Sequence, residues 1–320
     1  MSHKLGIKKL KIKVFRFNKE QDYLPHYDLF EMDVNQDELV LDIMNRIKWE
    51  HDGSFSYRRS CRHGICGSCS VKVNQKPTLA CKDNVFELVD IFGEELVIEP
   101  QDIKRAYKDM VIDKENFWNK YNSIQPYVVA PIDEFPTMEN IITQEEADYC
   151  ISCGNCFYAC PVVEVNDEFV GPMALTKAWR FNADVRDDVT AQRLDKLQEI
   201  GSGIWDCVKC NECAQACPKE LSPIDKITKL HQQTFQEKRS INNVAVRHAV
   251  GFKWSIQKHG ILDEGELVRY SEGNIGVLKH IPEAIAMFKR GKIVMPWNMP
   301  KSKNLSEIQK LVEISSTVNY

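Results

Sequence analysis

Two stretches, CISCGNCFYACP (Cys150–Pro161) and CVKCNECAQACP (Cys207–Pro218), share one cysteine spacing, C-x2-C-x2-C-x3-C-P. This spacing is typical of bacterial ferredoxins that hold cubane iron–sulfur clusters, in which the fourth cysteine of each run binds the other cluster. It predicts one [4Fe–4S] cluster held by Cys150, Cys153, Cys156 and Cys217, and a second held by Cys160, Cys207, Cys210 and Cys213. The crossed fourth ligands would tie together two segments that are distant in the chain.

Two other uses of these cysteines fit the pattern less well. A structural zinc site also takes four thiolates, but usually from two separated C-x2-C pairs rather than from one short run. Dense disulfide frameworks belong to small secreted domains that lack a core, whereas 320 residues are enough to bury one. The spacing therefore favours iron over both alternatives.

A third cysteine cluster precedes these runs. Cys61, Cys66 and Cys69 are spaced C-x4-C-x2-C and are followed by Cys81, which is the plant-type spacing for a [2Fe–2S] cluster. Gly64 and Gly67 lie between the ligands, where the backbone must approach the cluster closely and direct amides at it. A Rieske centre would need two histidines in place of two cysteines. Because all four cysteines are present, His63 is expected to be a surface neighbour and not a ligand.

The residues around the third cluster predict a small sheet that grasps one helix. Residues 9–17 and 26–34 alternate apolar and polar side chains, which is typical of half-buried strands. Val40, Ile43, Met44 and Ile47 follow at helical spacing and are expected to face the core. Residues 70–73 and 94–98 look like the closing strands, so we expect a ferredoxin-like β-grasp domain here.

Composition limits the function. The formal net charge is −4, whereas a nucleic-acid partner would require a basic face, and no apolar run is long enough to cross a bilayer. Residues 1–13 lack the apolar region of a secretory signal. The chain also lacks a dinucleotide-binding fingerprint and any hydrolytic constellation. We therefore expect no catalytic residue and no flavin on this chain.

Motifs over about residues 9–227 resemble, in the same order, the iron–sulfur subunit of succinate dehydrogenases and fumarate reductases. They are SCRHGICGSC (60–69), KDMVIDKENFWNKYNSIQPY (108–127), CISCGNCFYACP (150–161), FVGPMAL (169–175) and AWRFNADVRDD (178–188). The resemblance implies an α+β chain: a [2Fe–2S] domain over 1–107, a linker over 108–139, an all-α two-cluster domain over 140–240 and an extension over 241–320. Pro172 is expected near the start of a helix in the two-cluster domain.

The resemblance also implies an electron-transfer subunit without substrate chemistry of its own. In such a complex the chain relays electrons between a flavoprotein subunit, which carries FAD and the fumarate or succinate site, and a menaquinone-type quinone at a membrane anchor. The chain would then be peripheral on the cell membrane, on a side that the sequence leaves open. The direction of the reaction is equally open.

Two departures from the family pattern favour the methylmenaquinol:fumarate reductase or "type E" succinate dehydrogenase subtype. Most members lack a cysteine at the position of Cys210 and hold a [3Fe–4S] cluster there, whereas Cys210 predicts a complete [4Fe–4S] cluster. If Cys210 is not a ligand, the second cluster would be [3Fe–4S]. Val162, Val163, Glu164 and Val165 stand where many members have tryptophans beside the quinone, which puts the usual quinone pocket in doubt.

The C-terminal extension is similar to another family. GFKWSIQKHGILDEGELVRYSEGN (251–274) and IPEAIAMFKRGKI (281–293) resemble the C-terminal part of the small two-cluster subunit of heterodisulfide reductases. This implies an anchor subunit with cysteine-rich CCG domains, although the basic residues of 279–303 also suit a solvated surface or an acidic lipid surface. Two alternatives stay open: a thiol- or heterodisulfide-linked fumarate reductase, and a free ferredoxin-type carrier. A mobile carrier would need neither the linker nor the extension.

Overall fold

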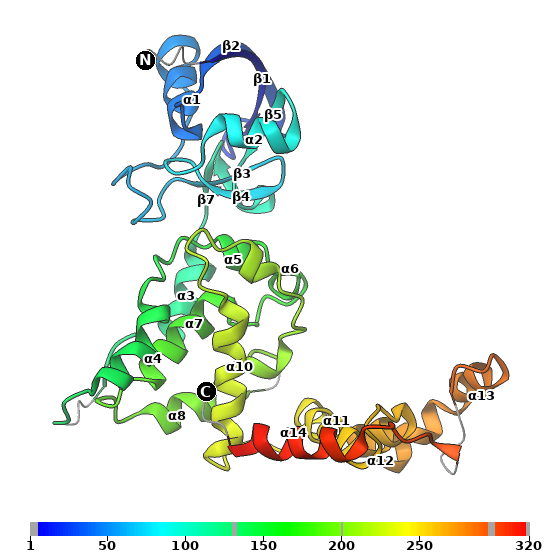
Figure 1. The fold of residues 1–320 in the computed structure, drawn as a ribbon. Coiled ribbons are helices and arrows are strands. Elements are labelled where there is room, and N and C mark those ends of the chain that lie inside the picture. The colour runs from blue at the N-terminus through cyan, green and yellow to red at the C-terminus, as the bar shows by residue number, and fades with distance from the viewer. Residues whose placement is uncertain (1–5, 130–132, 200, 294–297, 318–320) are drawn as a thin grey trace. The chain divides into compact units, whose positions relative to one another are not determined.

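The computed structural model describes residues 6–129, 133–199, 201–293 and 298–317, which form two compact units. The first unit comprises Met1–Gln232 and contains all twelve cysteines, none of which forms a disulfide. The second unit comprises Gln233–Tyr320. The predicted α+β class is confirmed, because a strand-rich domain precedes a helical one within the first unit (Figure 1).

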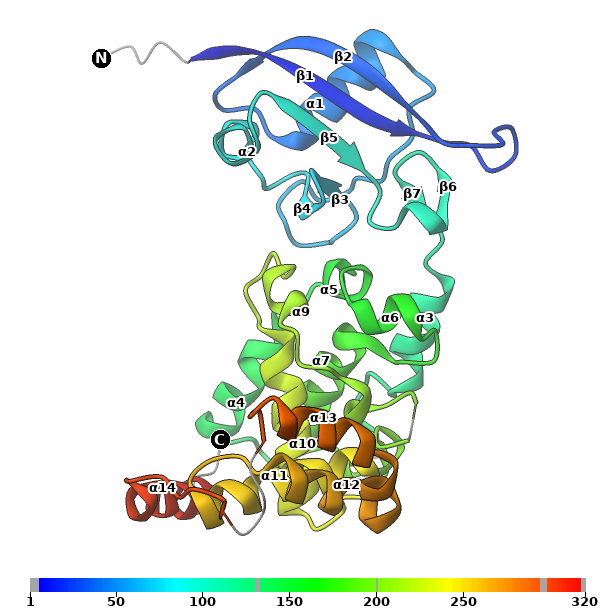
Figure 2. The ribbon, with the colours of Figure 1, turned by 90° about the vertical axis from the view of Figure 1, so that its right-hand side faces the viewer.

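One mixed sheet forms the N-terminal domain, in the order β2-β1-β5-β3-β4 (Figure 2). Its strands are β1 (Ile7–Arg16), β2 (His26–Asn35), β3 (Ser70–Val73), β4 (Lys76–Leu79) and β5 (Glu95–Glu99). β1 pairs antiparallel with β2 and parallel with β5, while β3 runs antiparallel to both of its neighbours. The strands expected at 9–17, 26–34, 70–73 and 94–98 therefore all exist, within two residues of their predicted ends.

The apolar alternation of β1 explains how this sheet is held. Leu10, Ile12 and Val14 are fully buried, while the lysines between them are not. Their face packs in one core with the inward residues of α1 (Val40–Arg46), its continuation η1 (Ile47–His51) and α2 (Val85–Phe92). Asn84 caps α2 by accepting hydrogen bonds from the amides of Phe86 and Glu87. This rigid domain presents residues 53–69 as a long loop beside the sheet.

The residues between the two cluster domains are structured. They form η2 (Ile103–Arg105), the two-stranded sheet of β6 (Ala106–Lys108) and β7 (Val111–Ile112), and the helix α3 (Glu115–Ser123). Phe117 of α3 is almost fully buried in the core of the helical domain. The stretch 108–139 therefore contributes side chains to the packing of the second domain.

Helices surround the two cysteine runs at residues 150–161 and 207–218. They are α4 (Met138–Asp148), α5 (Asn155–Tyr158), α6 (Pro161–Val165), α7 (Gly171–Asn182), α8 (Thr190–Lys196), η3 (Ile204–Asp206), α9 (Glu212–Gln215) and α10 (Pro223–Gln236). Pro172 lies in the first turn of α7, as expected. α7 is buried along most of its length and packs against α3, α4, α5 and α8, so it forms the centre of this domain.

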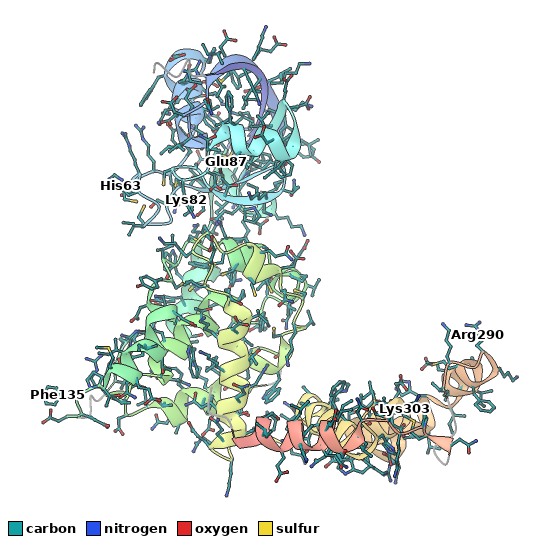
Figure 3. All side chains as sticks on the ribbon, in the orientation of Figure 1. His63, Lys82, Glu87, Phe135, Arg290 and Lys303 are labelled. Atoms are coloured by element: carbon teal, nitrogen blue, oxygen red, sulfur yellow. The ribbon has the colours of Figure 1, made fainter. Side chains whose placement is uncertain are left out.

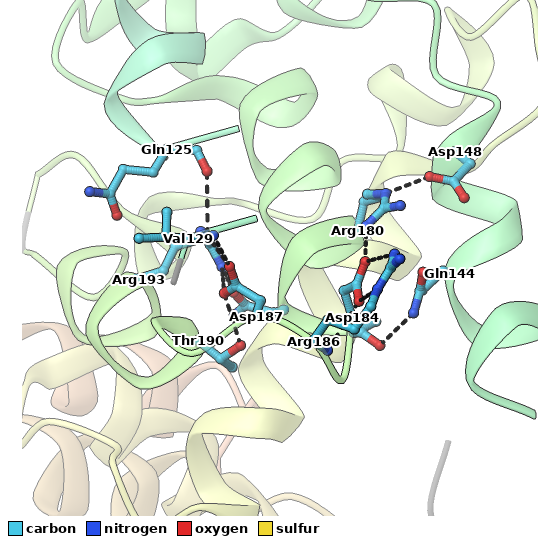
Figure 4. A network of polar contacts seen from close by, with 12 residues as sticks. Gln125, Val129, Gln144, Asp148, Arg180, Asp184, Arg186, Asp187, Thr190 and Arg193 are labelled. Carbon is cyan, nitrogen blue, oxygen red and sulfur yellow. Dashed lines mark hydrogen bonds and ion pairs between the residues drawn. The ribbon is translucent and has the colours of Figure 1, made fainter. Parts of the chain in front are cut away.

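A network of paired charges joins helices of this domain (Figure 4). Arg193 of α8 donates to the carboxylate of Asp187 at 2.8 Å, to the Asn182 side chain and to the Ile124 carbonyl. Arg180 and Arg186 both pair with Asp184, and their proximity holds the pKa of this carboxyl well below its usual range. Each charged group of this network pairs with one of opposite sign. The motif AWRFNADVRDD thereby holds α7 and α8 to α4 and to the end of α3.

The second unit is helical over its described residues. It contains α11 (Val244–His259), α12 (Glu264–Lys279), α13 (Ile281–Lys289) and α14 (Leu305–Thr317), and α11 packs against both α12 and α14. Pro282 lies in the first turn of α13, and Gly291 follows the helix with a positive φ. None of the helices found in the described part of the chain combines the length and apolar character needed to span a membrane.

Candidate iron–sulfur sites

The loop that carries Cys61, Cys66 and Cys69 points backbone amides at sulfur. The amides of His63 and Cys66 donate to Cys61 Sγ at 3.4 and 3.3 Å, and the amide of Gly64 donates to Cys81 Sγ at 3.2 Å. Such bonds stabilise sulfur that carries negative charge. His63 contributes only its backbone to this arrangement, and its side chain is exposed (Figure 3).

The four cysteines of this loop differ in their environment. Cys69 and Cys81 are buried, whereas Cys66 is exposed. Burial raises the pKa of the Cys69 thiol to about 12. Burial also opposes ionisation of Cys66, but hydrogen bonds from Ser68 and the Cys61–Cys66 backbone contact lower its pKa to about 6. One side of the site therefore faces the protein interior and the other faces solvent.

The first thiol set of the helical domain combines Cys150, Cys153 and Cys156 with Cys217, which comes from the other cysteine run. These four residues line one small cavity together with apolar groups from Ile151, Met173 and Leu221. Burial raises the pKa of the Cys156 thiol well above its usual value, and repulsion from the neighbouring thiolates of this set adds to the rise. The grouping is the one predicted for the first cubane.

The second thiol set combines Cys160 with Cys207, Cys210 and Cys213. These four residues line a second small cavity, whose walls include Val162, Phe169, Pro172, Ile224 and Ile227. Burial raises the pKa of the Cys213 thiol to about 12, with further contributions from Cys207, Cys160 and Cys210. Cys210 is exposed but lies within this set, so the structure places it among the other three thiols.

Both thiol sets suit iron–sulfur clusters in their donor chemistry. Each is a group of four sulfurs around an apolar cavity, without carboxylate or histidine donors among the lining residues. Cys156 and Cys213, whose thiol pKa values are raised by burial, would lose their protons when a cation binds in their place. Buried soft donors of this kind select iron–sulfur clusters or zinc over hard cations.

The [2Fe–2S] loop lies against the first thiol set within the first unit. A Cβ atom on Gly67 would come within 2.7 Å of the Cys153 Cα and 2.8 Å of its Cβ, so only glycine permits this approach. Cys153 in turn belongs to the same buried cluster as Cys69 and Cys81. Lys82, which follows Cys81, donates to the carbonyl of Pro218 at 3.0 Å (Figure 3). The two cluster-binding segments are therefore directly apposed.

Two residues outside the cysteine runs support this junction. Gln101 is buried and donates to the Cys153 carbonyl at 3.2 Å and to the Asn155 side-chain oxygen at 2.6 Å. Lys114 donates to the same Cys153 carbonyl at 3.2 Å, and burial lowers its pKa to about 8. Both contacts join segments that are far apart in the sequence, so no local pattern could have revealed them.

Two family models match the chain in these regions. The model described as "2Fe-2S iron-sulfur cluster binding domain" matches residues 11–119, and the one described as "4Fe-4S dicluster domain" matches residues 146–221. Together with the apposed thiol sets, they define the class of the chain: it is an iron–sulfur electron-transfer protein with a [2Fe–2S]-binding domain and a [4Fe–4S]-binding domain.

The curated relatives narrow this class. The fumarate reductase iron–sulfur subunit of Haemophilus influenzae is 34% identical over 235 residues, which cover 68% of this chain and 90% of the relative. The subunits of the same name from Escherichia coli O157:H7 and Mycobacterium tuberculosis are 36% and 34% identical and are covered to 89%. The chain belongs to the family of fumarate reductase and succinate dehydrogenase iron–sulfur subunits.

A solved structure agrees in fold. A chain of the Mycobacterium smegmatis Sdh1 complex in the apo form superposes with a TM-score of 0.63 at 24% identity, covering 74% of this chain and all of that one. The curated relatives and the two family models confirm the expected role: the protein is an electron-transfer subunit of the complex II family.

Proposed function

We propose that the twelve cysteines hold three clusters, which form a relay between a flavoprotein and a quinone-reactive membrane partner. Cys61, Cys66, Cys69 and Cys81 would bind the [2Fe–2S] cluster. Cys150, Cys153, Cys156 and Cys217 would bind the first [4Fe–4S] cluster, and Cys160, Cys207, Cys210 and Cys213 the second. The observation that carries this proposal is the exchange of Cys160 and Cys217 between the two cavities of the helical domain.

When bound, the clusters supply one-electron acceptors and donors, and the chain controls their surroundings. The amides of His63, Gly64 and Cys66 would stabilise the more negative, reduced state of the [2Fe–2S] cluster. Apolar walls would keep water from both cubane sites. Gly67 would keep the [2Fe–2S] and first [4Fe–4S] sites in contact, so that electrons cross between domains without a domain movement.

The fourth thiol of the second set determines the type of the last cluster. Cys210 lies with Cys160, Cys207 and Cys213, and a thiolate present among three ligands favours a complete [4Fe–4S] cluster. EPR of anaerobically prepared, oxidised protein should lack a strong three-iron signal, whereas the Cys210→Ala variant should gain one. Cys207→Ala serves as the matched control, because it removes a ligand shared by both cluster types. A strong three-iron signal in the fresh unmodified protein would refute the assignment.

The partners follow from the family. We propose a flavoprotein subunit with FAD and the fumarate or succinate site, and a membrane-associated anchor with CCG domains that reacts with a menaquinone-type quinone. The subtype proposed is methylmenaquinol:fumarate reductase or type E succinate dehydrogenase, peripheral on the cell membrane. The second unit, Gln233–Tyr320, supports a dedicated docking role because it lies outside both matched cluster domains.

Purification of the native complex tests these partners. A flavoprotein and a CCG-containing subunit should copurify with the chain, and reduced menaquinone should support fumarate reduction by the complex. Recovery of the chain alone would favour the free carrier, and activity with a dithiol donor only would favour the thiol-linked alternative. We also propose domain boundaries at residues 107, 139 and 240, and the unit boundary at Gln232 lies near the last of these positions.

A further inference from the structure

A buried histidine in the second unit has no hydrogen-bond partner within the described part of the chain. His259 is the last residue of α11 and is only 7% exposed. Both of its ring nitrogens are buried, and neither forms a hydrogen bond with any described residue. An imidazole always carries at least one donor or acceptor that must be satisfied when water is excluded. Its buried ring nitrogens are therefore available to bind a further group.

Two carboxylates lie beside this ring. Asp263 is 7% exposed and is the residue that caps α12, and Glu266 follows in the first turn of that helix. One ligand atom from each of the three residues falls within 4.8 Å of the other two. The turn is also held by Ser255, which is fully buried and accepts a hydrogen bond from the Asp263 amide at 2.8 Å. The donors thus project from a fixed connection between two packed helices.

The distance between His259 and Glu266 suits a shared cation. Nε2 of His259 lies 3.5 Å from Oε2 of Glu266 and makes no hydrogen bond to it. Two ligands on one tetrahedral zinc ion, each at about 2.0–2.1 Å, lie about 3.3 Å apart. Lys258 contacts Glu266 Oε1 at 3.1 Å and Oε2 at 3.3 Å. Its ammonium offsets part of the Glu266 charge, but it makes no hydrogen bond with the His259 ring.

We propose that His259, Asp263 and Glu266 bind one divalent transition-metal ion, with Zn²⁺ as the expected occupant, which fastens the α11–α12 turn. Imidazole and carboxylate together select first-row metals such as zinc. Three protein ligands would leave a position for water. This ion is separate from the twelve cysteines and has a structural role in the second unit. The competing arrangement is a plain ion pair between a protonated His259 and Glu266.

Zinc binding to the full, anaerobically purified chain with intact clusters tests this proposal. After chelator treatment, Zn²⁺ is added and the excess is removed by desalting. The unmodified protein should retain one equivalent of zinc, and His259→Gln and Glu266→Gln should each bind it at least about tenfold more weakly. His248→Gln is the matched control, since His248 is an exposed histidine on the same helix. It should bind zinc like the unmodified protein.

A second measurement needs no variant. Zinc X-ray absorption of the unmodified, zinc-loaded protein should show nitrogen and oxygen neighbours at about 2.0–2.2 Å and no sulfur at about 2.3 Å. The proposal is wrong if zinc is not retained, if it is surrounded by sulfur, or if His259→Gln and Glu266→Gln retain it as well as His248→Gln does. Should His259→Gln fail to fold, the absorption spectrum and the Glu266→Gln variant still decide between the metal and the ion pair.

Discussion

Single residues decide how closely the cluster-binding segments approach. Gly67 has a φ of +69° and no room for a Cβ beside Cys153, whereas Gly93 has a φ of +85° with open space around it. Gly67→Ala should therefore lower the melting temperature and the content of iron and sulfide. Gly93→Ala adds only backbone strain of about 1–3 kcal/mol. Calorimetry and iron analysis of both variants compare them, and equal effects would show that the close contact is unimportant.

Lys114 brings a positive charge to the junction. Its ammonium lies 3.2 Å from the carbonyl of Cys153 in a partly buried position. A nearby cation favours the reduced, more negative state of a cluster, so Lys114→Met should lower the reduction potential of the first [4Fe–4S] site by on the order of tens of millivolts. EPR-monitored redox titration measures this shift. Lys104→Met removes a lysine that is 75% exposed and should leave the potential unchanged.

The same residues show where sequence reasoning ends. The cysteine spacing predicted which thiols line each cavity, because it matches the ferredoxin pattern in which the fourth cysteine of each run joins the other set. Gln101, Lys114 and the contact of Gly67 with Cys153 depend on segments that meet only after folding. The His259 site was missed for a related reason. Its three residues are spaced i, i+4 and i+7, which is common on exposed helix faces. Only the structure shows that His259 is buried and has no hydrogen-bond partner among the described residues.

Elements of the helical domain are joined by charge as well as by apolar packing. The side chains of Arg193 and Asp187 are 1% and 0% exposed. Removing one member of such a pair leaves a buried charge without compensation, which costs about 3–5 kcal/mol. Arg193→Met should lower the free energy of unfolding by this amount in denaturant melts. Arg193→Met combined with Asp187→Asn should recover part of the loss.

The exposed ion pair of Lys104 with Glu164 provides the comparison for this network. Both side chains are more than half exposed, so Lys104→Met should leave the free energy of unfolding nearly unchanged. If Lys104→Met and Arg193→Met lowered the free energy of unfolding by the same amount, the buried ion pair would not be a special source of stability. The strands and α7 could be predicted from periodicity and from Pro172, but this network could not, because charges in a motif look the same whether they are buried or exposed.

At the scale of the whole molecule, the chain divides at Gln232. α10 ends at Gln236, and the exposed Lys238 follows in a backbone conformation with a φ of +54°. Brief trypsin treatment of the anaerobic protein should cut first near Lys238. The larger fragment should keep the visible absorption of all three clusters. Cleavage inside the cysteine-bearing unit before this position would contradict the division into two units.

The exchange of Cys160 and Cys217 has a consequence for biogenesis. Each proposed set of four cysteines takes residues from both cysteine runs. A nascent chain that has emerged only as far as α8 therefore lacks a complete ligand set for either [4Fe–4S] cluster. If the proposed ligand sets are right, neither [4Fe–4S] cluster can be completed until the segment with Cys207–Cys217 has been synthesised. For the same reason, oxidative loss of one [4Fe–4S] cluster would free a segment that also carries a ligand of the other cluster. Repair would then have to rebuild both clusters.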